Sequence, residues 1–180
     1  EMRVGSFPIG IDAQSMAEST KAPEVKDLCE TIRAHVSKRQ IVFGLDRLDY
    51  TKGIPERLRA FANLLQRFPE LRHRINLIQV VVPSREGIQK YDELRLEIEQ
   101  LVGAINGQYA EIGWIPVHYM FRSLTKTELL SFYRAADIAL ITPLKDGMNL
   151  VAKEFCACSA RRESVLILSQ FAGAAAQLGR

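Results

Sequence analysis

The stretch from Thr142 to Glu154, TPLKDGMNLVAKE, holds the residues best suited to chemistry. It joins a short apolar run to a segment with a helical pattern, and Gly147 permits backbone angles that other residues avoid. N–H groups at the start of the expected helix, from about Met148 to Val151, favour a negatively charged ligand. The carboxylates of Asp146 and Glu154, the second about one turn inside the helix, add hydrogen-bond acceptors. This combination suits a ligand with both hydroxyls and phosphates, as a nucleotide sugar has.

Two cations, Arg47 and Lys52, lie in the polar loop that follows the apolar run 40–45. At the carboxyl end of a strand, they can hold a diphosphate and neutralise the charge that grows as it leaves. The alternative is a solvated basic loop in which the cations pair with Asp46 and Asp49. Spacing alone leaves both interpretations open.

Arg85 occupies the equivalent position after the next apolar run, 75–82. Its guanidinium could bind a separate phosphate, which is the more specific interpretation, or it could simply be solvated. The same choice applies to the first stretch, where Asp146 could be a turn or cap residue and Glu154 a solvated helix residue. Strand–turn–helix junctions with glycine are common, so the turn alone does not decide.

Strands and helices alternate through most of the chain and must position these loops. The expected strands are 40–45, 75–82, 115–120, 137–141 and 164–169, and the expected helices are 23–38, 54–68, 86–105, 125–135 and 150–158. Most strands are continuous apolar runs, which is typical of a parallel sheet covered on both faces. The expected fold class is therefore α/β, with a Rossmann-like parallel sheet. Asn106-Gly107 predicts the end of the long helix, and residues 3–11 predict a short strand and turn.

Composition narrows the class of protein. The 180 residues suffice for one domain with a full core, nearly half are apolar and a quarter are charged, as in ordinary globular proteins. The net charge of +3 is small and its positive residues are scattered, which argues against a nucleic-acid partner. No apolar run approaches the roughly 20 residues that span a membrane, and no secretory signal is visible. The G-x-G-x-x-G and P-loop patterns are absent, so neither a nicotinamide fingerprint nor an ATPase is supported.

The cysteines Cys29, Cys156 and Cys158 lack C-x-x-C spacing, and the histidines form no metal pattern with them. They indicate reduced thiols in a cytoplasmic protein, and no metal or other cofactor is implied. The chain begins at Glu1 rather than Met and stops at Arg180 as a further helix begins. We therefore expect a single domain over 1–180 that is a fragment of a longer protein.

An ordered set of short motifs resembles the trehalose-6-phosphate synthases. The motifs are RLDYTKG at 47–53, PSR at 83–85, NG at 106–107, GW at 113–114, DGMNLVAKE at 146–154 and LSQFAG at 168–173. No single motif decides the resemblance, but the ordered set is highly specific and covers nearly the whole chain from Phe7 onward. What the chain resembles is the carboxyl-terminal, nucleotide-sugar-binding half of these enzymes, which have two Rossmann-like domains in the GT-B arrangement.

The resemblance implies retaining glucosyl transfer from UDP-glucose to glucose 6-phosphate, without a metal, giving trehalose 6-phosphate and UDP. It makes Arg47 and Lys52 the catalytic cations that hold the donor diphosphate, and Arg85 the residue that reaches the acceptor phosphate. The remaining implied contacts are Asp146 and the backbone of Gly147, Met148, Asn149 and Leu150 for the donor glucose, Glu154 for the ribose, and Val80, Leu129 and Val151 for the uridine pocket.

Several alternatives stay open at this point. The family's amino-terminal domain, which supplies most acceptor contacts, is absent, so the acceptor could differ, as in a glucosylglycerol-phosphate synthase. A regulatory homologue that binds a nucleotide sugar without catalysis would keep the same residues. First principles do not separate uridine from guanosine in the donor, and the full protein could be a homo-oligomer. We expect this chain alone to bind the donor weakly and not to turn over.

Overall fold

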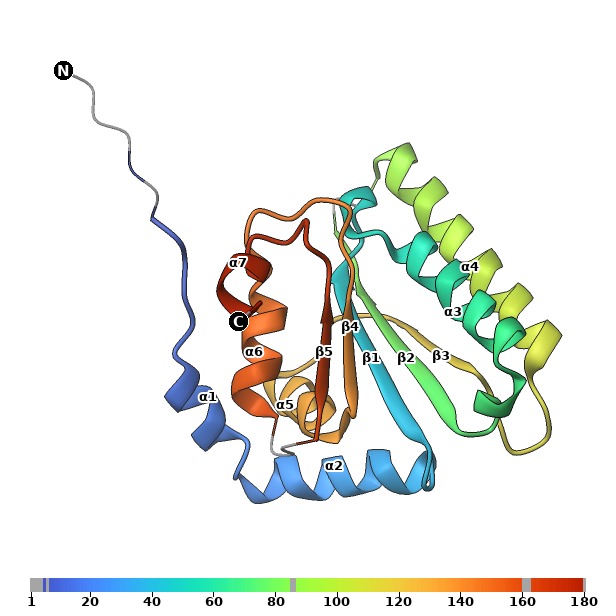
Figure 1. The fold of residues 1–180 in the computed structure, drawn as a ribbon, viewed down its shortest axis with the longest axis horizontal. Helices are drawn as coiled ribbons and strands as arrows, with labels where there is room; N and C mark the ends of the chain where they lie inside the picture. Colours follow the sequence, from blue (N-terminus) through green and yellow to red (C-terminus); the bar gives the residue numbers. More distant parts are fainter. Residues whose placement is uncertain (1–4, 6, 85–86, 160–162, 180) are drawn as a thin grey trace.

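The computed structural model describes residues 5, 7–84, 87–159 and 163–179, which contain a five-stranded parallel sheet (Figure 1). Its strands are β1 (Gln40–Arg47), β2 (Ile75–Val82), β3 (Val117–Phe121), β4 (Ile138–Ile141) and β5 (Val165–Leu168). Their spatial order is β3-β2-β1-β4-β5, and every pairing is parallel. The chain first adds β2 and β3 on one side of β1 and then crosses over to add β4 and β5 on the other side. That reversal sets the loops after β1 and β4 side by side, where open α/β sheets bind ligands.

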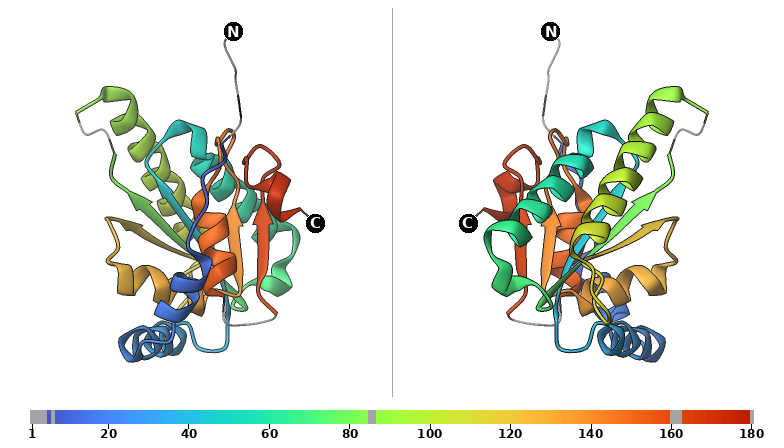
Figure 2. Two further views of the ribbon diagram at one scale, coloured as in Figure 1. Left: turned by 90° about the vertical axis from the view of Figure 1, so that its left-hand side faces the viewer. Right: turned by 90° about the vertical axis from the view of Figure 1, so that its right-hand side faces the viewer.

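Helices cover both faces of the sheet (Figures 1 and 2). One face carries α3 (Ile54–Arg67) and α4 (Gln89–Tyr109), and the other carries α2 (Pro23–His35), α5 (Lys126–Ala135) and α6 (Leu150–Cys158). Two clusters of buried apolar side chains, one under each helical layer, form the core. The predicted α/β class with a parallel sheet between two helical layers is confirmed. No helix in the described ranges is both long and apolar enough to cross a membrane.

Strands form where the sequence has continuous apolar runs. Residues 41–46 of β1 are all buried, and β2 is buried along all but its last residue. A strand loses both faces to the interior only when helices cover both sides of its sheet. Pro23 and Pro55 lie in the first turns of α2 and α3. A backbone N–H at these positions would have no acceptor within the helix, so proline breaks no helical hydrogen bond there.

The predicted end of the long helix at Asn106-Gly107 is wrong, because α4 continues to Tyr109. The side chain of Asn106 donates to the carbonyl of Val117 at 2.9 Å and accepts from the Val117 N–H at 3.0 Å. Asn106 therefore satisfies the backbone of β3, an edge strand, from within a helix. A local turn signal cannot reveal such a distant partner.

Smaller differences concern the ends of elements. β3 begins two residues later than predicted, since Ile115 is half exposed and Pro116 has no N–H for the ladder. The strand predicted over 3–11 is absent at its described residues, where Phe7 and Ile9 are exposed and have no core to pack against. The helix α1 (Ala13–Ser19), which packs against α6, carried no prediction, whereas the further helix expected near the end of the chain is present as the short α7 (Ala175–Leu178).

Candidate functional site

A cavity of about 330 Å³ opens at the carboxyl edge of the sheet. Its walls come from the end of β1, from the 3-10 turn η1 (Tyr50–Lys52) and from the loop between β4 and α6. The residues that line it are Leu45, Asp46, Arg47, Lys52, Asp146, Met148, Asn149, Leu150 and Val151. The N–H groups of Leu144 and Lys145 both donate to the carbonyl of Thr51, at 2.8 and 3.1 Å. These bonds join the two loops, and with them most of the residues predicted to bind the donor.

Lys52 and Asp146 form an ion pair inside this cavity. Lys52 Nζ lies 2.6 Å from Asp146 Oδ2, and the two side chains are only 13% and 15% exposed. The same carboxylate accepts hydrogen bonds from Asn149 Nδ2 at 3.1 Å and from the Met148 N–H at 3.3 Å. Burial alone would raise the pKa of Asp146, but the hydrogen bond and charge of Lys52 outweigh it and lower that pKa. Asp146 thus orders the turn, and the Met148 N–H is not free, contrary to expectation.

Arg47 is the cation that the protein leaves available. Its side chain is exposed at the cavity and forms no hydrogen bond or ion pair within the described ranges. Arg47 is solvated, as the alternative interpretation of this loop expected, but among the described residues neither Arg47 nor Lys52 forms an ion pair with Asp46 or Asp49. Asp46 pairs instead with Arg57, and Asp49 accepts from the N–H and hydroxyl of Thr51 at 2.8 and 2.7 Å. A negatively charged ligand can therefore reach Arg47 without displacing a partner.

The turn into α6 is built around Asn149 rather than Gly147. Asn149 has a φ of 70°, and its side-chain oxygen caps α6 by accepting from the Ala152 N–H at 3.0 Å. Asparagine tolerates this left-handed conformation better than most residues. Gly147 has no positive φ, so the expectation that it supplies special backbone angles is wrong. Leu150 and Val151 line the cavity, and their N–H groups, in the first turn of α6, have no acceptor within the helix.

Glu154 contacts a buried tyrosine on the neighbouring helix. Its Oε2 accepts a hydrogen bond from the Tyr133 hydroxyl at 2.8 Å. Burial, followed by the nearby Glu154 carboxylate, raises the pKa of Tyr133, so the hydroxyl remains a donor. Glu154 is half-buried and lies outside the cavity lining. Of the predicted uridine contacts, Val151 lines the cavity, whereas Val80 is fully buried in the core and Leu129 is partly buried against the same core cluster.

A buried arginine that the sequence analysis missed joins the segments around the cavity. Arg57 is 2% exposed and donates to Asp46, to Gln79 Oε1 at 3.0 Å and to Thr142 Oγ1 at 3.1 Å. Burial raises the pKa of Asp46, although the charge of Arg57 opposes this. A signal was available in the sequence. Arg57 falls three residues after Ile54, on the apolar stripe of its helix, where a solvated cation is not expected.

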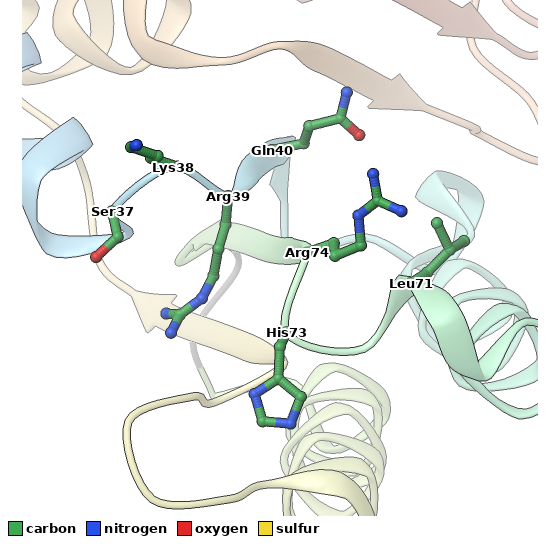
Figure 3. A pocket seen from close by; sticks show the side chains of 7 residues that line it. All are labelled: Ser37, Lys38, Arg39, Gln40, Leu71, His73 and Arg74. Atoms are coloured by element: carbon green, nitrogen blue, oxygen red, sulfur yellow. The ribbon is translucent and has the colours of Figure 1, made fainter.

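Other features of the chain add nothing to this site. Arg85, the candidate for a separate phosphate, lies outside the described residues. Among those described, no group of three or more His, Cys, Asp or Glu side chains could hold a metal ion. Two other cavities are larger. One, of about 720 Å³, lies beside α2 and β3, and the other, of about 670 Å³, lies at the amino ends of β1 and β2. Neither is lined by a residue that the sequence analysis predicted to bind a ligand. In the second, Figure 3 shows the guanidinium groups of Arg39 and Arg74 pointing in different directions.

Comparison with known proteins places the chain among glycosyltransferases. The model of glycosyltransferase family 20 matches residues 1–180. This chain belongs to glycosyltransferase family 20. The trehalose-6-phosphate synthase of Mycobacterium leprae is 48% identical to it over 178 residues, which cover 98% of the chain and 36% of that relative.

Solved structures resemble this family 20 chain throughout its fold. An alpha,alpha-trehalose-phosphate synthase (UDP-forming) from Burkholderia xenovorans, in complex with glucose-6-phosphate, matches with a TM-score of 0.93 and 38% identity, covering 97% of this chain and 39% of that one. A trehalose-6-phosphate structure from E. coli, bound with UDP-2-fluoro glucose, matches with a TM-score of 0.91 and 39% identity, over 96% and 38%. The chain spans less than two-fifths of these relatives. The expected fold, a Rossmann-like half of a GT-B glycosyltransferase, is confirmed.

Proposed function

We propose that this chain is the nucleotide-sugar-binding half of a trehalose-6-phosphate synthase, which transfers glucose from UDP-glucose to glucose 6-phosphate with retention. The observation that carries the proposal is the cavity where Arg47, Lys52 and the first turn of α6 meet. A ligand with a diphosphate and a sugar has groups for all three. Relatives that are 45 and 48% identical are named for this synthesis, and two similar structures hold glucose-6-phosphate and UDP-2-fluoro glucose.

In this proposal the donor diphosphate lies between Arg47 and the first turn of α6. Arg47 offers a planar fork of donors that fits phosphate oxygens. The N–H groups of Leu150 and Val151 add partial positive charge at the helix start. Lys52 becomes a second cation for the diphosphate when it leaves Asp146. As the bond between glucose and diphosphate breaks, charge grows on the leaving group, and these fixed donors stabilise the transition state more than the bound substrate.

The donor sugar occupies the side of the cavity formed by the turn before α6. Asp146, once Lys52 has moved to the diphosphate, can accept a hydrogen bond from a glucose hydroxyl. The backbone from Gly147 to Leu150 forms the adjacent wall, and Glu154, oriented by Tyr133, accepts from the ribose. Arg85 reaches the acceptor phosphate, and a separate amino-terminal domain supplies the other acceptor contacts.

Titration calorimetry of the chain against UDP, GDP and ADP tests the donor site. UDP is expected to bind most tightly, and heat from none of the three would refute the proposal. Arg47→Ala is expected to weaken UDP binding at least about tenfold, because a charge-assisted hydrogen bond contributes about 1.5–3 kcal/mol. Arg67→Ala, an exposed arginine at the far end of α3, is the matched control and should bind UDP normally. Equal binding by Arg47→Ala would remove its diphosphate role.

Turnover separates the proposed enzyme from its alternatives. The protein, expressed at the full length of its gene, is supplied with UDP-glucose and either glucose 6-phosphate or glycerol 3-phosphate. We expect UDP release and trehalose 6-phosphate with the first acceptor. Product with the second acceptor alone would indicate a glucosylglycerol-phosphate synthase. UDP binding without product from either acceptor would indicate a regulatory homologue.

A further inference from the structure

We infer that Arg57 is a positioning residue for the donor site, holding in register the three segments that carry its ligand-binding groups. The inference rests on the proposed function. Arg57 does not line the cavity and is not itself a ligand. It lies in the first turn of α3, and its guanidinium is buried between Asp46 near the end of β1, Gln79 inside β2 and Thr142 just after β4.

Each contact of Arg57 ends on a segment that carries a candidate ligand. Its Nη1 donates to Asp46, the residue before Arg47, and its Nη2 donates to the Lys52 carbonyl at 3.4 Å. Its Nε donates to Thr142 Oγ1 at 3.1 Å, at the start of the loop that leads to Asp146. One rigid guanidinium thus fixes the spacing of the segments that bear Arg47, Lys52 and Asp146.

The surroundings of Arg57 are shaped to accept a guanidinium. Gly44 lies in the middle of β1, where a side chain would otherwise pack against the neighbouring strand. A Cβ on Gly44 would lie 2.9 Å from Arg57 Nη1 and would collide with Gln79 Oε1. Gln79, fully buried in β2, accepts from the same nitrogen at 3.0 Å. Gly44 leaves space for the guanidinium, and Gln79 supplies an acceptor for it. A lysine cannot reproduce the planar fork of donors that arginine presents.

Core stability alone does not account for this arrangement. Replacing a buried ion pair with well-packed apolar residues is often neutral or stabilising. Arg57 lies on the same stripe of α3 as Ile54, Leu58 and Phe61, where an apolar side chain would join the existing cluster. An apolar residue could not, however, connect Asp46, the Lys52 carbonyl and Thr142 at once.

A double-mutant cycle between Arg57 and Lys52 tests the inference. UDP affinity is measured by calorimetry on the protein at the full length of its gene, for wild type, Arg57→Lys, Lys52→Ala and the double variant. Arg57→Lys keeps the charge but loses the fork, and we expect it to weaken UDP binding at least about tenfold. In the Lys52→Ala background the same change should weaken UDP binding by only about threefold, because one of the ligand contacts that Arg57 positions is already lost. A purely structural role would give equal losses in both backgrounds and would overturn the inference.

Two further variants separate positioning from unfolding. Thr142→Val removes one contact of Arg57, and we expect about threefold weaker UDP binding together with a lower melting temperature; normal binding by this variant would also overturn the inference. Asn106→Ala breaks the bonds to Val117 far from the cavity, and we expect it to lower the melting temperature without changing UDP affinity. Loss of UDP affinity in Asn106→Ala would show that any destabilisation weakens binding, against the inference. A wild type that does not bind UDP refutes the proposed function itself.

Discussion

At the scale of single residues, the charges of the site neutralise one another before any ligand arrives. Lys52 pairs with Asp146, and Asp46 pairs with Arg57, so Arg47 carries the excess positive charge of the cavity. In the proposed donor site, a diphosphate competes with Asp146 for Lys52. The Asp146 carboxylate that is released then becomes available to the sugar, so the proposal couples binding of the diphosphate to binding of the sugar through this one exchange of partners.

Asp146→Asn tests the exchange. Removing the carboxylate frees Lys52, and we expect affinity for UDP alone to rise about fivefold, a change of about 1 kcal/mol in binding free energy. UDP-glucose should lose this advantage, since the amide is a weaker acceptor for the sugar hydroxyl. Calorimetry with both ligands gives the ratio. An unchanged or weaker UDP affinity would mean that Lys52 does not need to leave Asp146.

Sequence patterns predicted which loops lie together better than they predicted the partners of single side chains. The cavity gathers Arg47, Lys52 and Asp146, as expected from loops at the carboxyl ends of strands. The pairing of Lys52 with Asp146 could not be foreseen, because the residues are 94 positions apart. Glu154 faces Tyr133 for a similar reason, since which side a helical residue presents depends on the helix packed against it. Its ribose contact stays a prediction.

At the scale of elements, hydrophobic periodicity predicted the strands and most helices, and local breaker signals failed where a distant partner existed. Asn106 and Gly107 read as a helix end, yet Asn106 is held in α4 by the backbone of β3. Gly147 read as the special position of its turn, yet Asn149 has the left-handed φ. Composition indicates that a turn is present, but the tertiary contacts decide which residue adopts the strained angle.

The start of α5 provides a pH test. Thr125 and Glu128 form a capping box, and Glu128 also pairs with Arg122. The hydrogen bond from Arg122, then that from the Thr125 backbone, lowers the pKa of Glu128 from 4.5 to about 2. Because the folded-state pKa is the lower one, this stabilisation is complete above about pH 4.5 and is lost as the pH falls toward 2.

We therefore expect Glu128→Gln to lower the free energy of unfolding by about 1 kcal/mol at pH 7, and by progressively less as the pH drops below 4.5. Urea unfolding at several pH values measures the difference from wild type. Glu30→Gln, at an exposed position of α2, should show no such trend. A constant difference across the pH range would remove Glu128 as its source.

Replacing Gly53 or Gly107 with alanine should change the free energy of unfolding in opposite directions. Gly53, between η1 and α3, has a φ of 64°, and an added Cβ would lie 2.7 Å from the Thr142 carbonyl oxygen. Gly53→Ala should cost about 2 kcal/mol of unfolding free energy and weaken UDP binding, because η1 carries Lys52. Gly107→Ala, inside α4 with open space around it, should stabilise by about 0.5–1 kcal/mol. Denaturant unfolding of both variants checks this, and a neutral Gly53→Ala would show that the turn can relax.

At the scale of the whole molecule, the carboxyl edge of the sheet brings together Arg47, Lys52, Asp146 and the first turn of α6, which are proposed to hold the donor. The reversal of strand order between β1 and β4 places these loops side by side, and Arg57 of α3 donates hydrogen bonds to Asp46 and Thr142 on the two neighbouring segments. The parallel sheet was predictable from the continuous apolar runs. The hydrogen bonds of Arg57 were not predicted, because they depend on which strands become neighbours in the sheet.

The division of labour between domains gives the last prediction. The described residues that line the cavity of about 330 Å³ include Arg47, Lys52 and Asp146, which are proposed for the donor, and none of them is assigned to the acceptor. We expect the 180-residue chain to bind UDP-glucose but to release no UDP from it when glucose 6-phosphate is added. The same assay, with UDP release coupled to NADH oxidation, should show turnover for the protein at the full length of its gene. Trehalose 6-phosphate made by the chain alone would mean that the acceptor site is built from these residues, and the proposed split between donor and acceptor domains would fail.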